Sequence, residues 1–168
     1  KGERKLIELR DERLWSLEYG GPPDWLERSI DHLAAHPRAV SPGTFVFVLS
    51  DFLPGSSADV WLAAVEHRWD IVPVVIQDPT WEQSFPEVSG IVVPLREPRS
   101  GRLAPVRLRR KEASARKVLN EERLDALLET FRFLDIDPVV VSSNDRSAIL
   151  EQFLVWTDLR RTRRVVGA

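Results

Sequence analysis

The stretch Phe45-Val46-Phe47-Val48-Leu49-Ser50-Asp51 places an unbroken apolar run, rich in β-branched and aromatic residues, directly before two polar ones. Residues 71–76 and 138–141 repeat this pattern. Runs of this length are typical of strands that are buried on both faces of a sheet. Between the first two runs, the apolar residues of 58–69 recur at helical spacing. Strand, helix and strand in this length predict a right-handed parallel crossover.

Helical periodicity is present in four segments, 24–36, 58–69, 121–133 and 145–156. Three of them begin near pairs with capping-box spacing, which are Asp24 with Glu27, Ser56 with Asp59, and Ser142 with Asp145. The predicted fold class is therefore α/β, with three layers in which helices cover both faces of a mostly parallel, Rossmann-like sheet.

Two further segments alternate apolar and polar residues. Residues 5–9 and 14–19 predict an antiparallel hairpin at one edge of the sheet. Residues 91–106 predict either a second hairpin or a long excursion over the sheet. Pro94 and Pro98 exclude a central strand there, because proline lacks the N–H that a sheet ladder needs.

Composition bounds the function. The chain has 168 residues, 24 Lys and Arg against 26 Asp and Glu, and no Cys, which fits one domain over 1–168 and excludes disulfides, thiolate metal sites and thiol nucleophiles. It contains no apolar run long enough to span a membrane. The net charge of -2 argues against wholesale binding to nucleic acid. Lys1 in place of an initiator Met predicts a piece of a longer protein.

Polar residues follow each predicted strand, at the edge where open parallel sheets bind ligands. They are Ser50 and Asp51, then Asp78, then Ser142, Asn144 and Asp145. Their oxygens are suited to a hard divalent cation. The alternative interpretation is that they are ordinary turn formers and helix caps.

No complete catalytic motif accompanies these residues. The sequence has no nucleophile elbow, no phosphate-binding glycine loop and no dinucleotide fingerprint. His32 and His36 have the spacing of a metal pair, but the Glu of a His-Glu-x-x-His motif is missing, and a solvated helix end explains them.

Basic residues cluster in two places. The first cluster is Arg99, Arg102, Arg107, Arg109, Arg110, Lys111, Arg116 and Lys117; the second is Arg160, Arg161, Arg163 and Arg164. They predict either a contact for phosphates or an acidic protein, or a solvated hairpin and a frayed tail. Trp25 and Trp81 lie beside polar turns, so they are candidate interface anchors.

Several segments in order resemble one bacterial family, domain of unknown function 58. They are 47–53, 69–79, Ser100-Gly101-Arg102, Leu134-Asp135-Ile136-Asp137 and the Arg-rich end. The resemblance covers about 45–164 and implies a divergent von Willebrand factor A-like domain. Members of that family have membrane-spanning helices upstream and are commonly encoded near MoxR-type AAA+ ATPases.

Von Willebrand factor A domains bind Mg²⁺ through an Asp-x-Ser-x-Ser loop, a Thr loop and a third Asp. Ser50-Asp51 matches the third position, whereas the Asp-x-Ser-x-Ser loop is absent from this sequence and Thr44 is predicted at the opposite rim. Asp51 alone is too small a ligand set to retain Mg²⁺, so no cofactor is expected.

The resulting hypothesis is a non-enzymatic protein-interaction domain. Its binding rim is Ser50, Asp51, Asp78, Ser142 and Asn144, with Asp51 at the centre, and the segment 99–117 is a possible second contact. The absence of Cys and of a signal-like segment fits a cytoplasmic location. The resemblance implies a MoxR-type ATPase as partner and tethering to the inner membrane by segments outside this chain. The alternative is a metal-dependent nuclease or phosphoryl-transfer enzyme that uses Asp51, Asp78 and Asp145.

Overall fold

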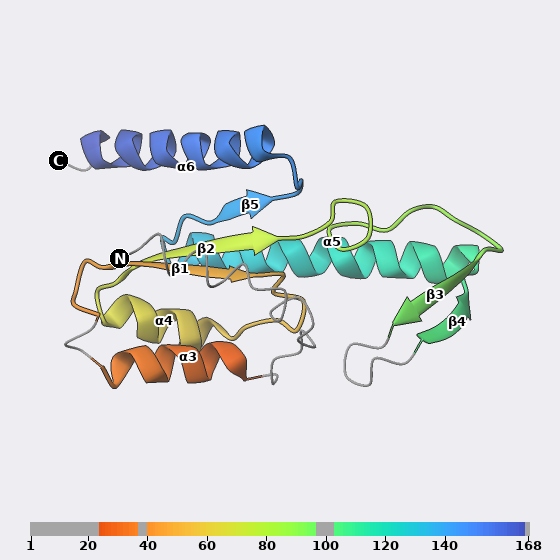
Figure 1. Ribbon diagram of the computed structural model, residues 1–168, viewed down its shortest axis with the longest axis horizontal. Helices are drawn as coiled ribbons and strands as arrows, with labels where there is room; N and C mark the ends of the chain where they lie inside the picture. The colour runs from red at the N-terminus through yellow and green to blue at the C-terminus, as the bar shows by residue number, and fades with distance from the viewer. Residues whose placement is uncertain (1–23, 37–39, 97–102, 167–168) are drawn as a thin grey trace, which may run out of the picture.

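The computed structural model describes residues 24–36, 40–96 and 103–166 (Figure 1). In chain order the elements are α3 (Trp25–Ala34), β1 (Phe45–Ser50), α4 (Ala58–Glu66), β2 (Asp70–Ile76), β3 (Val92–Arg96), β4 (Leu103–Arg107), α5 (Arg110–Phe133), β5 (Val139–Val141) and α6 (Arg146–Val166).

A parallel sheet of three strands, in the order β1-β2-β5, organises the described chain. Phe45 pairs with Asp70 and Val74 with Val139, so neighbouring strands run in the same direction. β2 lies between the other two, and its residues from Ile71 to Val75 are buried, as expected for a central strand covered on both faces. The three predicted strands and their parallel crossovers are confirmed, and the fold is mixed α/β.

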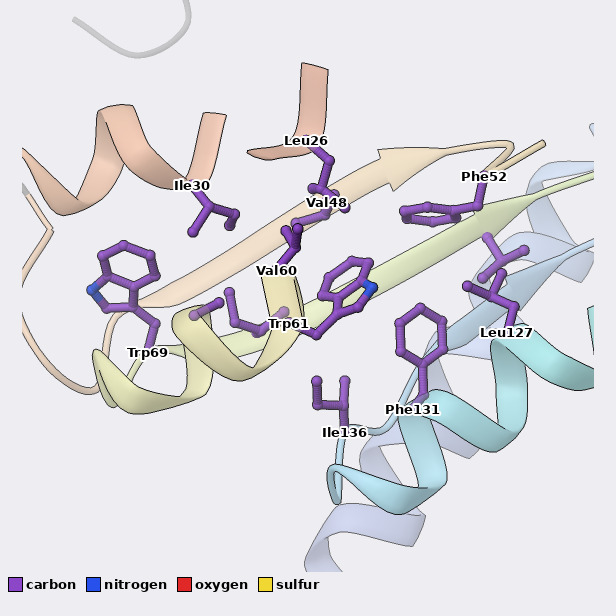
Figure 2. Packing of buried hydrophobic residues seen from close by; sticks show 13 residues of the cluster. Leu26, Ile30, Val48, Phe52, Val60, Trp61, Trp69, Leu127, Phe131 and Ile136 are labelled. Carbon is purple, nitrogen blue, oxygen red and sulfur yellow. The ribbon is translucent and has the colours of Figure 1, made fainter. Parts of the chain in front are cut away.

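The larger core lies on one face of this sheet. Side chains of β1 and β2 meet side chains of α3, α4 and α5 there (Figure 2). Trp61 of α4 and Phe131 of α5 are fully buried, and their rings meet edge to face with centroids 4.9 Å apart. Helical spacing in α4 and α5 places these large rings on the faces that look toward the sheet.

A smaller core lies on the other face, under α6. Alternate residues of β2, Val72 and Val74, join Val139 and Val141 against Ile149, Phe153 and Trp156 of α6. α6 covers β2 and β5 and reaches the near side of β1, where the rings of Phe153 and Trp156 each lie 6.4 Å from the Phe47 ring and the Arg160 guanidinium lies 5.5 Å from the Phe45 ring. The β1 side chains Phe45, Phe47 and Leu49 nevertheless remain 52%, 48% and 62% exposed.

Of the two alternatives for residues 91–106, the structure shows the hairpin, as a separate two-stranded sheet. β3 and β4 pair antiparallel, with Pro94 opposite Pro105. Val106 packs with Phe85, Leu108 and Ala113 in a satellite cluster, so this hairpin sits on the N-terminal half of α5. The first predicted hairpin, 5–9 with 14–19, lies outside the described residues.

Two helices are longer than predicted. α5 begins at Arg110 rather than 121, and α6 continues to Val166, so the Arg-rich end is helical rather than a frayed tail. The parts of these helices that were not predicted, 110–120 and 157–166, carry basic residues in place of regularly spaced apolar ones. No helical periodicity of apolar residues therefore marks them in the sequence. Among the described residues, no helix combines the length and the apolar character that a bilayer crossing requires.

The predicted capping boxes are wrong in detail. α3 and α4 show no side-chain cap hydrogen bond; Ser57 is the N-cap of α4, and Ser56 instead accepts a bond from Trp61 Nε1 at 2.8 Å. At α6, Asp145 itself is the cap, because its Oδ1 accepts the N–H of Ala148 at 2.9 Å.

Candidate functional site

The three parallel strands point their carboxyl ends to the same side of the sheet (Figure 1). Polar residues follow each strand and form one rim, which Gln77 holds together. Gln77 follows β2 and is 3% exposed. Its Nε2 donates to the carbonyl oxygen of Asp51 at 2.5 Å, and its backbone N–H donates to Val141 at 3.1 Å. Gln77 thus ties the ends of all three strands. The expectation that Asp51 is central is wrong for the described sheet, because β1 lies at its edge.

Ser50 and Asp51 shape the turn that leaves β1. Ser50 Oγ accepts the N–H of Phe52 at 3.0 Å, and Asp51 Oδ1 accepts the N–H of Leu53 at 3.1 Å. Phe52 has a φ of 51°, an unusual backbone conformation for a non-glycine residue. These side-chain bonds satisfy the backbone there, while the Asp51 side chain stays exposed.

Asp78 organises the next turn in the same way. Its Oδ1 accepts the N–H groups of Thr80 and Trp81 at 2.8 and 2.9 Å. Its own N–H donates to Glu82 Oε2 at 2.7 Å, which closes the turn from the other side. Asp78 is exposed, as the rim hypothesis requires, but its carboxylate already has a structural role.

The polar residues after β5 are also exposed. Ser142 Oγ accepts Gln83 Nε2 at 2.8 Å, which joins the end of β5 to the segment after β2. Asn144 is exposed in the connection to α6, and Asp145 caps that helix. The rim residues predicted from sequence therefore lie at the same end of the sheet, whereas Thr44 precedes β1 at the opposite end.

The donor set does not fit the Mg²⁺ site that the family resemblance implies. Within residues 24–36, 40–96 and 103–166, no three His, Asp or Glu side chains gather closely enough to hold a metal ion. Asp51, Asp78 and Asp145 therefore lack the convergence that the enzyme alternative requires. Each has a carboxylate oxygen bonded to backbone N–H groups instead. These contacts match the interpretation as turn formers and caps.

Two side chains of α5 hold the segment 78–86 in place. Asn120, which is 6% exposed, donates through Nδ2 to the carbonyl oxygens of Trp81 at 3.1 Å and Ser84 at 2.5 Å. Arg123 donates to the Glu82 carbonyl at 2.5 Å and to Asn120 Oδ1 at 3.3 Å. Because Asn120 and Arg123 are one helical turn apart, both reach the same loop and bond three of its carbonyls, those of Trp81, Glu82 and Ser84. This loop, 78–86, is named the pinned loop below.

The pinned loop presents Trp81 beside the rim. The Trp81 ring is 44% exposed and packs edge to face on buried Phe85, with centroids 5.4 Å apart. Trp25, the other candidate anchor, is partly buried against the larger core and lies 6.4 Å from the Phe52 ring. Only Trp81 of the two retains the exposure that an interface anchor needs.

No protein-family model matches this chain, and no match was found among curated proteins or solved structures.

Sequence reasoning missed four residues that build the site: Gln77, Gln83, Asn120 and Arg123. Gln77 had a weak signal, since it directly follows the most apolar run of the chain. Asn120 and Arg123 had none, because polar residues on a helix are ordinarily solvated. Their partners lie at least 36 positions away in sequence, so only the tertiary fold brings them together.

The basic contact patch is only partly within the described residues. Arg99 and Arg102 lie outside them; Arg107 ends β4, and Arg109, Arg110 and Lys111 surround the start of α5, all exposed. Arg116 lies over the Phe85 ring at 5.6 Å, and Lys117 is 4.0 Å from Glu87. The cluster is thus divided between a hairpin and a helix.

Arg160 of the second basic cluster has a structural role. Its Nη2 bonds both carboxylate oxygens of Asp70 at 2.6 and 2.8 Å. Its guanidinium also lies 4.9 Å from the Trp156 ring centroid, a cation–π distance. Arg160 therefore joins α6 to the start of β2.

Proposed function

We propose that this chain is a non-enzymatic protein-interaction domain that docks a partner protein on its strand-end rim. The docking surface, named the rim surface below, consists of Ser50, Asp51, Asp78, Trp81, Ser142 and Asn144. We assign the domain, on its parallel sheet and family resemblance, to a von Willebrand factor A-like three-layer architecture. The basic contact patch serves as a second contact in this proposal.

The observation that carries this proposal is the half-exposed Trp81 on a loop that is already fixed. Tryptophan is enriched among the residues that dominate binding energy at interfaces. A partner that binds a mobile loop must supply the free energy needed to order it. Asn120 and Arg123 already hold the pinned loop through its carbonyls, so much of that cost is met by folding.

The polar neighbours of Trp81 support a protein partner as well. Asp51, Asp78 and Asn144 are exposed. Exposed polar residues around a central aromatic anchor are the usual composition of an interface rim. Turn bonds fix the Asp51 and Asp78 carboxylates in space, so they also favour one docking orientation.

The resemblance to domain of unknown function 58 suggests the partner class, a MoxR-type AAA+ ATPase. We accordingly place the interaction on the cytoplasmic side of the inner membrane, with membrane-spanning segments outside this chain. This part of the proposal depends on the resemblance alone.

The test is capture of a purified MoxR-type ATPase from the same organism by the immobilised 168-residue chain. Trp81→Ala and Asp51→Ala should each weaken capture, by roughly tenfold or more for the tryptophan if it is a central anchor. Phe133→Ala is the matched aromatic control, because Phe133 is 87% exposed at the end of α5 that leads into the N-terminal end of β5.

The outcomes separate the two parts of the proposal. Unchanged capture by both rim variants, with folding verified by circular dichroism, contradicts the rim surface. Failure of the unmodified chain to capture the ATPase contradicts the partner class. A large loss of folded Asp51→Ala protein would mean that Asp51 acts only in its turn.

A further inference from the structure

The outer edge of β5 is open in the described part of the chain. β5 pairs with β2 on one side only. Val141 directs its carbonyl toward β2, where Gln77 N–H bonds it at 3.1 Å. In a parallel ladder successive residues direct their backbone groups to opposite sides, so the N–H and C=O of Val140 point to the open edge. An open edge of this kind can accept an additional strand.

A cavity lies beside this edge. Its volume is about 230 Å³, and it is lined by Val140, Val141, Ser142, Ser143, Ala148, Ile149 and Gln152. The lining joins the end of β5 to the first turns of α6, which runs above β5 in Figure 1. Such a volume is large enough to receive an aliphatic side chain.

One flank of α6 continues from the cavity lining, and the cavity, this flank and the open edge of β5 are together called the groove. Ala148 and Gln152 line the cavity, and Val155 and Leu159 continue on the same flank at helical spacing, 50% and 57% exposed. The helix is held over the strand because Trp156 Nε1 donates to the Asp137 carbonyl at 2.9 Å. The groove therefore has a backbone edge on one side and an apolar helix flank on the other.

We propose that this groove binds an extended peptide segment of a partner protein, added as a further strand on β5. An edge of backbone donors and acceptors recognises any extended chain, and the cavity selects an aliphatic side chain. From Ala148 to Leu159 the flank spans about 16 Å, the length of about five residues of strand. This inference stands on the groove, which shares Ser142 with the rim surface but requires neither Trp81 nor the carboxylates of Asp51 and Asp78.

The size of the groove distinguishes a peptide from a second copy of the chain. β5 has three residues, and Val140 alone directs both backbone groups outward. A standard protein–protein interface buries about 1,600 Å² in total, more than a three-residue edge and one small cavity supply. A short extended segment, in contrast, matches the groove in length and in chemistry.

The polar end of the groove also suits a peptide backbone. Ser142 Oγ accepts Gln83 Nε2 at 2.8 Å, and Ser143 Oγ accepts the N–H of Asp145 at 3.1 Å. A hydroxyl that accepts a bond can still donate its own hydrogen. Both serines can therefore donate to carbonyl oxygens of a bound chain.

The experiment is fluorescence anisotropy of a labelled eight-residue peptide, valine alternating with threonine, titrated with the 168-residue chain. We expect saturable binding with a Kd in the micromolar range. The same peptide with N-methylated valines cannot donate from those positions and should not bind. Val140→Pro removes the outward N–H without touching the β2 ladder, and Ala148→Leu fills the cavity; each should weaken binding by about tenfold or more.

Leu154→Ala is the matched control, because Leu154 is 57% exposed on the other flank of α6. It should bind the peptide like the unmodified chain. Thermal melts verify folding, and Ala148→Leu provides the test if Val140→Pro does not fold. Absence of saturable binding, equal binding of the N-methylated peptide, or unchanged binding by Ala148→Leu overturns the proposal. Self-association of the free chain that Val140→Pro abolishes also overturns it, in favour of a second copy.

Discussion

Burial differs sharply between two phenylalanines that are two positions apart on α5. Phe131 is 0% exposed and packs against Trp61, whereas Phe133 is 87% exposed. Both residues are equally hydrophobic, so sequence composition does not rank them. Their directions around the helix differ by about 200°, which places one ring in the core and the other in solvent.

We expect Phe131→Ala to lower the free energy of unfolding by about 3–5 kcal/mol, because it removes a buried ring and leaves a cavity. Phe133→Ala should change it by less than about 0.5 kcal/mol. Urea denaturation followed by circular dichroism measures both. Similar losses for the two variants would contradict the assignment of the core.

Arg160 gives a second prediction at the residue scale. Its side chain and that of Asp70 are 22% and 18% exposed, so their ion pair is only partly screened by solvent. Arg160→Ala should reduce the free energy of unfolding by about 1–2 kcal/mol through loss of charged hydrogen bonds. Arg161→Ala, at an exposed neighbouring position, is the control and should be close to neutral in the same urea titration.

The N-cap of α6 shows how one side chain starts an element. Asp145 accepts the N–H of Ala148, one of the donors that the first helical turn leaves unpaired. Asp145→Ala should therefore cost about 1 kcal/mol of stability in thermal or urea unfolding. Asp145→Asn retains an acceptor and should be nearly neutral. Equal effects of the two variants would mean that the charge, rather than the cap bond, matters at this position.

At the scale of elements, α5 positions the pinned loop. Asn120 is buried, and its Nδ2 donates hydrogen bonds to the carbonyl oxygens of Trp81 and Ser84. Asn120→Leu keeps a similar volume and leaves those carbonyls without their donor. We expect a loss of about 1–3 kcal/mol, the usual cost of unpaired buried polar groups. Amide hydrogen exchange should also accelerate at residues 80–85.

The same variant connects the pinned loop to the proposed function. If loop order assists docking, Asn120→Leu should weaken partner capture although Asn120 itself is buried. Exchange rates at residues 80–85 that match those of the unmodified chain would contradict the role of Asn120 as the restraint on this loop.

At the scale of the whole molecule, the described residues divide between a main body and a satellite. The hairpin β3–β4 rests on the small cluster of Phe85, Leu108 and Ala113, apart from the parallel sheet. Few buried contacts hold it there. Regions with little buried apolar surface open locally at lower free energy than the core.

Native-state hydrogen exchange should therefore show the β3–β4 amides opening at a lower free energy than those of β2. Phe85→Ala should lower the opening free energy of the hairpin more than that of β2, because Phe85 belongs to the satellite cluster. A single opening free energy shared by β2, β3 and β4 would contradict this division.

Local sequence pattern alone determined the strands of the parallel sheet and the core halves of their helices, and it limited residues 91–106 to a hairpin or an excursion over the sheet, of which the structure shows the hairpin. The physical reason is that a buried strand or an amphipathic helix must carry its own apolar residues at fixed spacing. The role of Asp51 and Asp78 as turn formers was likewise predictable from sequence, since their side-chain hydrogen bonds reach only two or three residues along the chain.

Only the tertiary structure decided which strand lies at the centre of the rim, how Gln77 joins three strand ends, and where Asn120 and Arg123 bond. These contacts connect residues distant in sequence, and a single polar residue carries no periodic signal of its partner. The helical extent of the basic segments was decided in the same way. Propensity is a weak prior there, and the packing of Leu108 and Ala113 with Phe85 secures the first turn of α5.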